Sequence, residues 1–161
     1  MKGYGIMKKR FVSNKALNHS SKGNFFYSKT GKRQLIMKSG GHGQENISFL
    51  TKRNMSHDID TVFSNGVRLG HISPHRLRRD RKKNGHAWFP KHWKKREIKA
   101  AGRYVASLKR NKPLIDDKRY TGRYKGVTVG IIAKNNRIKT IFPAFDVNKH
   151  ARNKATVIFS K

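Results

Sequence analysis

The sequence contains no cysteine, only 8 acidic residues against 39 lysines and arginines, and only 4 prolines. The absence of cysteine excludes disulfides, thiolate-bound zinc and thiol nucleophiles. No apolar run approaches the roughly 20 residues that a membrane-spanning helix needs, so we expect no stable membrane insertion. The basic N-terminus, "MKGYGIMKKRF", is not followed by an apolar segment. We therefore expect no conventional signal peptide.

The shortage of acidic residues gives the chain a formal net charge of +31 at pH 7. A field of this strength attracts polyanions, and neutralising phosphates releases their condensed counterions. Nucleic acid is the partner that this charge favours most, and an acidic protein is a second candidate. The composition alone is also typical of basic RNA-binding proteins that are not enzymes.

The charge is uneven along the chain, because residues 1–44 contain no acidic residue at all. This segment is rich in Ser, Gly and Asn and has little apolar periodicity, which is typical of a flexible or partly ordered arm. Its apolar stretches "NFFYS" and "RQLIM" could each add an edge strand. We expect two regions: a basic N-terminal arm over residues 1–44 and a folded domain over 45–161.

The segment "WKKREIKAAGRYVASLKR" carries the strongest helical pattern of the chain. Ile98, Ala101, Val105 and Leu108 are spaced by three, four and three residues, which places them on one face of an amphipathic helix. Pro113 prevents the helix from continuing. The helix is therefore expected to bury this face against a neighbouring layer.

Two strands are predicted after the helix. Apolar residues alternate over residues 127–131, "NN" at 135–136 fits a tight turn, and alternation resumes in "RIKTIFP" over 137–143. Because side chains alternate between the faces of a strand, Thr140 and Phe142 must share a face. The later "ATVIFS" predicts one more strand. A helix followed by antiparallel strands indicates the α+β class.

Histidine is the residue type best suited to catalysis in this chain, because thiols are absent and carboxylates are few. The eight histidines are at positions 19, 42, 57, 71, 75, 86, 92 and 150. Two histidines can cleave RNA without metal: one removes the proton from the 2′-hydroxyl and the other protonates the departing 5′-oxygen. A lysine or hydroxyl would then stabilise the phosphorane.

Metal binding is the competing use of these histidines. His71 with His75, and His86 with His92, lack Cys or Glu at a recognised ligand spacing, so we expect no metal and no cofactor. Three further histidines occur in polar surroundings, and we assign them no role: His19, His42 and His150.

Five short motifs in a fixed order carry a resemblance to a known family. They are "HI" at 71–72, "GH" at 85–86 followed by "FP" and "W", the helix ending "AGRYVASL", "GRYKGVTVGII" and "NNRIKTIFP". Over residues 70–143 the chain resembles the bacterial EndoU nucleases, domains that commonly form the C-terminus of toxins used between competing bacteria. The resemblance implies an α+β, EndoU/barnase-like fold with a helix packed on an antiparallel sheet, and it does not include the arm.

The resemblance also implies site residues. The catalytic histidines of the family match His71 in "LGHIS" and His86 in "NGHAWFP", with His75 as an alternative to the first. Trp88, Phe89 and Trp93 would then be core residues that position His86. The family's Thr-x-Tyr-Pro element matches "TIFP", which gives Thr140 a role at the scissile phosphate or the uridine.

The expected substrate-binding residues are Phe142, Lys125 and Lys139. Phe142 replaces the tyrosine that is common in the family, so it can stack on a base but cannot donate a hydroxyl proton. Some members use a lysine as the third catalytic group, and the two lysines are the nearby candidates for that role.

Our leading hypothesis is a metal-independent endoribonuclease toxin that leaves a 2′,3′-cyclic phosphate and a 5′-hydroxyl. Its target would be tRNA or single-stranded RNA, with a preference for uridine. It would be secreted or delivered to act in the cytoplasm of a target cell, function as a monomer and be neutralised by an acidic immunity protein. The alternative is a non-enzymatic, basic RNA-binding protein.

Overall fold

The computed structural model describes residues 12–144 and the backbone of residues 156–157. The expectations for residues 1–11 of the arm and for His150 lie outside these ranges. The helices are α2 (Asn14–Ser21), α3 (Gln44–Lys52), α4 (Arg78–Arg81) and α5 (Lys95–Ser107), with a 3-10 turn, η1, at Lys109–Asn111. No helix in the described ranges is both long enough and apolar enough to cross a membrane.

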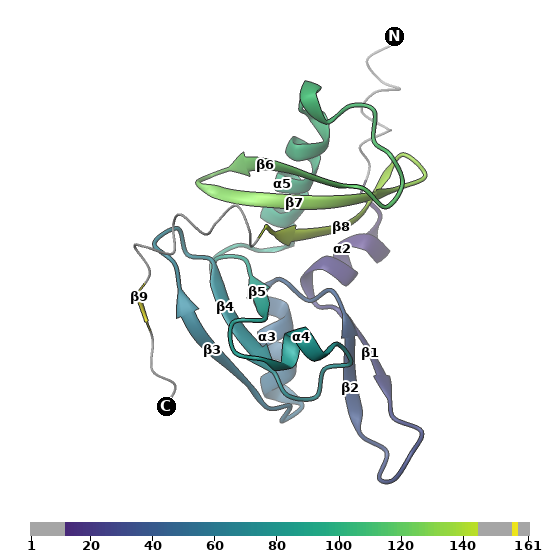
Figure 1. Cartoon of the computed structure of the whole chain (residues 1–161), viewed down its shortest axis with the longest axis vertical. Helices are drawn as coiled ribbons and strands as arrows, with labels where there is room; N and C mark the ends of the chain where they lie inside the picture. The colour runs from purple at the N-terminus through teal and green to yellow at the C-terminus, as the bar shows by residue number, and fades with distance from the viewer. Residues whose placement is uncertain (1–11, 145–155, 158–161) are drawn as a thin grey trace.

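The strands form three small antiparallel sheets, so the α+β class is confirmed (Figure 1). The first sheet is the hairpin of β1 (Asn24–Tyr27) and β2 (Leu35–Ser39). The second, in the order β5-β4-β3-β9, contains β3 (His57–Val62), β4 (Arg68–Ile72), β5 (His86–Trp88) and β9 (Thr156–Val157). The third, in the order β6-β7-β8, contains β6 (Arg119–Tyr124), β7 (Val127–Lys134) and β8 (Arg137–Pro143).

The third sheet and α5 are the part of the fold that the sequence predicts best. Asn135 and Asn136 form the β7–β8 turn with φ of 52° and 60°, a left-handed conformation that asparagine tolerates. Ile98, Ala101 and Val105 of α5 are fully buried and pack with the apolar residues of β7 and β8 in one core. A helix packed on an antiparallel sheet is therefore confirmed (Figure 1).

A second, smaller core lies under the sheet that contains β3, β4 and β5. It combines Met37 of β2 and Leu50 of α3 with Ile72 and Trp88. Phe89 and Trp93, by contrast, belong to the core beneath α5, where their rings stack with centroids 5.0 Å apart. The prediction that Trp88, Phe89 and Trp93 are core residues is confirmed, and together they connect the two cores.

The described part of the expected flexible arm is folded. Residues 14–39 form α2, β1 and β2, and Val12 and Leu17 are buried in the core beneath α5. The Oγ of Ser20 in α2 accepts a hydrogen bond from the Ile141 amide in β8 and donates one to the Ala16 carbonyl. This segment is held by buried hydroxyl and backbone hydrogen bonds as well as by apolar side chains, so its hydrophobic pattern is weak.

Candidate active site between two sheets

A cleft opens between β8 and the segment that contains α4 and β5. It consists of two adjoining pockets of about 350 Å³ each. Both pockets are lined by His42, Arg79, Asp80, His86, Arg119 and Phe142. His19 and Thr140 line one of the two pockets in addition. We refer to the two pockets together as the cleft.

A glycine-rich loop brings His42 to His19. Gly40 and Gly41 have φ of 71° and 72°, and a Cβ on Gly40 would collide with the His19 carbonyl. The amides of residues 41, 42 and 43 donate in turn to the carbonyls of residues 19, 20 and 21, at 2.9, 2.6 and 3.0 Å. The loop "SGGHG" therefore pairs with the end of α2, and this backbone ladder carries both histidines to one wall of the cleft.

His42 is fixed with one ring nitrogen available. Its Nδ1 lies 2.8 Å from the Ala87 carbonyl, an acceptor that requires a proton on Nδ1. Its ring stacks on His86 with centroids 5.0 Å apart and planes 6° apart. Burial, reinforced by the charge of His86, lowers the pKa of His42 to about 3. In the neutral ring Nε2 is unprotonated, and it has no hydrogen-bond partner among the described residues.

His19 is held in a similar way. Its Nδ1 lies 3.1 Å from Asn24 Oδ1, at the start of β1. Burial lowers the pKa of His19, the hydrogen bond to Asn24 partly opposes this shift, and the charge of Lys139 adds to it. His19 and His42 therefore line the same pocket, and each uses Nδ1 as its anchor.

Both ring nitrogens of His86 are occupied. Nδ1 lies 2.7 Å from Asp80 Oδ1, and Nε2 lies 2.7 Å from the carbonyl of Gly41. Both acceptors are satisfied when both nitrogens carry protons, which fits an imidazolium paired with a carboxylate. His86 is 2 % exposed. It therefore holds the loop that carries His42 and supports the His42 ring, while neither of its nitrogens is available to a substrate.

Asp80 is the buried counter-charge of this arrangement. Burial acts to raise its pKa, but hydrogen bonding and charge from His86, with help from His75 and Arg79, lower the pKa overall. Its Oδ2 has no hydrogen-bond partner among the described residues, although Arg79 Nε lies 3.9 Å away. The side chain is 6 % exposed.

His75, Asp80 and His86 place potential ligand atoms within 4.8 Å of one another. His75 Nδ1 accepts the Leu77 amide at 2.9 Å, so the proton of the neutral ring is on Nε2, the atom that faces Asp80. Burial lowers the pKa of His75 to about 4. The hydrogen bonds of His75 and His86 leave neither ring with a lone pair directed at a shared ion. The three residues therefore fit a hydrogen-bonded cluster better than a metal site.

The opposite wall comes from β8 and β6. Thr140, 9 % exposed, and Phe142 both line the pocket that holds His19, as expected for residues on one face of β8. The Phe142 ring lies 6.3 Å from the His42 ring, and the guanidinium of Arg119 lies 5.1 Å from its centroid. Thr140 Oγ1 has no hydrogen-bond partner among the described residues. A hydroxyl, an aromatic ring and a cation thus face the two histidines.

The other residues expected at the site lie elsewhere. His71 in β4 lines neither pocket, and its ring nitrogens lie 2.9 Å from Asp60 and 3.3 Å from Asp58. Lys125, with φ of 48°, is in the β6–β7 turn. Lys139 is exposed beside Thr140, with its Nζ 3.9 Å from Asp117, and lines neither pocket. The structure therefore brings His86, Thr140 and Phe142 together without His71 or either lysine.

Sequence reasoning gave no role to several residues that line the cleft, among them His19, His42 and Arg119. The available signal was the glycine pair in "SGGHG", because two successive glycines before a histidine indicate a backbone that L side chains cannot follow. Arg119 has no such signal, since it is one of many basic residues of the chain.

A family model supplies the deciding comparison. The model described as "Bacterial EndoU nuclease" matches residues 13–144 of the 161-residue chain. The chain belongs to the bacterial EndoU nuclease family. The EndoU match starts at α2 and ends just after β8, so it includes the part of the expected arm from which His19 and His42 come. Searches of curated proteins and of solved structures found no significant match.

Membership of the EndoU family makes the protein a nuclease, and it favours an enzyme over the alternative of a non-enzymatic RNA-binding protein. The cleft described above is the place in this EndoU chain where paired histidines, a hydroxyl and a stacking ring meet.

Proposed function

We propose that the protein is a metal-independent endoribonuclease whose two acid–base groups are His19 and His42. The observation that carries this proposal is that both imidazoles line one pocket. Each is anchored through Nδ1 to an oxygen, which leaves Nε2 for the substrate. This assignment replaces the pair His71 and His86 that the motifs favoured, because His71 lies outside the cleft and both nitrogens of His86 are bonded.

In the proposed reaction His42 is the general base. With its pKa lowered to about 3, the ring is neutral at physiological pH and can accept the proton of a ribose 2′-hydroxyl. The 2′-oxygen attacks phosphorus, the bond to the 5′-oxygen breaks, and His19 protonates that leaving oxygen. The products are a 2′,3′-cyclic phosphate and a 5′-hydroxyl. The phosphodiester anion, once bound beside His19, favours the protonated imidazole that this role requires.

The opposite wall would bind the nucleotide. Phe142 offers a face on which a base can stack, backed by Arg119. The Thr140 hydroxyl and the guanidiniums of Arg119 and Arg79 would stabilise the phosphorane, whose charge is greatest in the transition state. The positive charge of Lys139 acts near His19 and would help to bind the phosphodiester. A uridine preference is part of this proposal, with Phe142 in the place of the tyrosine common in the family.

We also propose that the nuclease is a delivered toxin, which acts in the cytoplasm of a target cell on tRNA or other single-stranded RNA. The net charge of +31 and the basic residues at the cleft would suit an acidic immunity protein that covers the cleft. Co-purification with such a partner and the loss of cleavage in the complex would test this extension.

The central test is cleavage of an RNA that contains a single uridine, in EDTA, with the product ends identified. The wild type should produce a 2′,3′-cyclic phosphate, and His19→Ala and His42→Ala should each lower kcat by about 10²- to 10⁴-fold. His71→Ala and the exposed His92→Ala serve as matched controls and should stay within about threefold of the wild type. A large loss in His71→Ala with activity retained in His42→Ala would overturn the assignment. A wild type that cleaves no RNA, with or without added manganese, would leave the RNA-binding alternative.

A further inference from the structure

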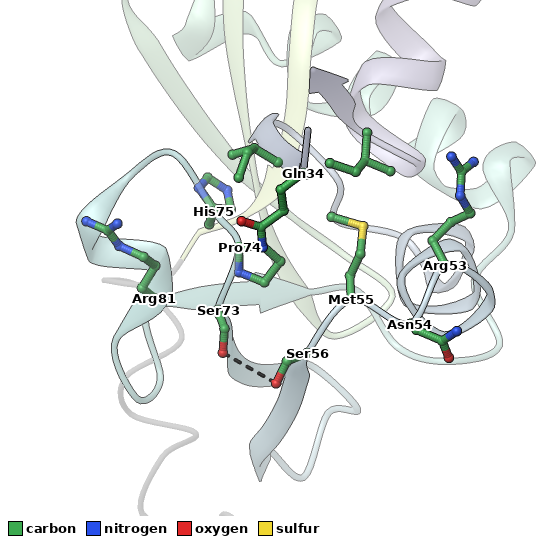
Figure 2. Close-up of a pocket in the computed structure, with 11 residues that line it drawn as sticks. Gln34, Arg53, Asn54, Met55, Ser56, Ser73, Pro74, His75 and Arg81 are labelled. Carbon is green, nitrogen blue, oxygen red and sulfur yellow. Dashed lines mark hydrogen bonds between the residues drawn. The ribbon is translucent and has the colours of Figure 1, made fainter. Parts of the chain in front are cut away.

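A third pocket, of about 490 Å³, adjoins the cleft at His75. It lies between the start of β2, the loop from α3 to β3, and the segment from β4 to α4 (Figure 2). The buried His75 lines both this pocket and the cleft, so the two adjoin each other. We call it the arginine pocket, after Arg53 and Arg81.

The arginine pocket combines apolar and polar walls. Leu35, Met55 and Pro74 supply apolar surface. Gln34 and Asn54 supply amide groups, and Ser73 and Ser56 lie close enough for a hydroxyl–hydroxyl bond of 3.4 Å. Apolar walls with a few amides and hydroxyls can hold a planar base and hydrogen-bond to its edge.

Two guanidiniums flank the pocket, and Figure 2 shows them on opposite sides of it. No acidic residue lines the pocket, and Arg81 has no ion pair with any described residue. Arg53 donates to the hydroxyl of Tyr27 at 2.9 Å, which holds that aromatic ring, 43 % exposed, close to the pocket. Tyr27 is also the cross-strand partner of Leu35 in the pocket wall. The positive charge and the nearby ring favour a nucleotide over an acidic peptide.

We propose that the arginine pocket is a second nucleotide-binding subsite, which holds a base of single-stranded RNA at a distance from the scissile bond. Arg53 and Arg81 bind the phosphates on either side of that base. The proposal rests on the proposed function for the identity of the ligand, and it adds that long substrates bind more tightly than short ones. Because His75 lines both pockets, the two sites lie next to each other, and one strand can reach both.

The first experiment compares substrate lengths. Arg53→Gln/Arg81→Gln is assayed on a uridine dinucleotide and on an unstructured RNA of roughly 12 nucleotides. We expect KM for the longer RNA to rise about 10-fold or more, with the dinucleotide unaffected. The matched control, Arg78→Gln, removes an exposed arginine of α4 that lines neither this pocket nor the cleft. Equal losses on both substrates, or in the control, would overturn the proposal.

The second experiment does not depend on cleavage. A labelled 2′-O-methyl RNA of the same length has no 2′-hydroxyl to attack phosphorus, so its affinity reports binding alone. The double variant should bind it about 10-fold more weakly than Arg78→Gln does. Unchanged affinity would overturn the subsite. Failure of the wild type to cleave any RNA would instead contradict the proposed function, while this binding result would still decide on the subsite.

Discussion

At the scale of single residues, the histidines of the cleft show that hydrogen-bond partners determine what an imidazole can do. His42 and His86 stack on each other, yet one has a nitrogen available and the other has none. The motif around His86 indicates a rigid, apolar environment, and the structure has one. The partners of its nitrogens, Asp80 and the Gly41 carbonyl, are 6 and 45 residues away in the chain. No local pattern could have revealed the second of them.

The pair of His86 and Asp80 leads to a prediction about stability. His86→Leu leaves the Asp80 carboxylate buried without its partner, which should lower the free energy of unfolding by about 3–5 kcal/mol. Urea denaturation measures this change, with His92→Ala as the exposed control. Asp80→Asn/His86→Leu removes the stranded charge as well, so it should be less destabilised than the sum of the single variants. Strict additivity in this double-mutant cycle would contradict a coupled ion pair.

The lowered pKa values of His75 and His42 predict a pH dependence. Both rings stay neutral in the fold but become protonated in the unfolded chain near pH 6.5, so the unfolded state binds more protons below that pH. The contribution of these neutral rings to the free energy of unfolding should be complete above about pH 6.5 and decrease towards pH 4. For His75 the decrease should be on the order of 3 kcal/mol. Urea titrations between pH 7.5 and 4 measure this. His75→Asn should show a shallower decline, and an unchanged one would contradict the assignment.

At the scale of elements, α5, β7 and β8 were predictable because apolar periodicity and the Asn-Asn turn are local signals. Helix α2 was not, because two of its three buried residues are serines, Ser20 and Ser21. Its place in the fold depends on hydrogen bonds to residues 41–43 and to Ile141, none of which leaves an apolar pattern. For the same reason no apolar pattern indicated that His19, in α2, and His42, in the loop after β2, line the cleft.

The contact between α5 and β8 can be tested at Gly102. A Cβ at this position would collide with Cδ1 of Ile141, so Gly102→Ala should destabilise the fold by about 1–3 kcal/mol despite the better helix propensity of alanine. Ile141→Val removes the closest atom, and the double variant should recover part of the loss. Arg103→Ala, on the exposed side of α5, is the control and should be nearly neutral. Thermal and urea denaturation would show whether the two positions are coupled.

At the scale of the whole molecule, the formal net charge of +31 sets the conditions under which the fold is most stable. Self-repulsion opposes the compact state, and a bound polyanion both relieves the repulsion and stabilises the folded form. At low ionic strength, saturating polyphosphate should raise Tm by roughly 5–10 °C. Neutral dextran should not, and about 1 M NaCl should abolish the effect through screening. A Tm that does not change with polyphosphate would contradict a destabilising effect of electrostatic self-repulsion.

The hydrogen bond from the Ile141 amide to Ser20 spans 121 positions of the chain. It joins the two ends of the EndoU region, because His19 and His42 come from its start and Thr140 and Phe142 from its last strand. During synthesis the ribosome releases both histidines long before β8, so the nascent chain has no complete cleft until the last strand emerges. A chain cut in the β6–β7 turn at Lys125 would likewise give two pieces, one with His19, His42 and Arg119 and the other with Thr140 and Phe142, and cleavage of RNA would depend on their reassociation.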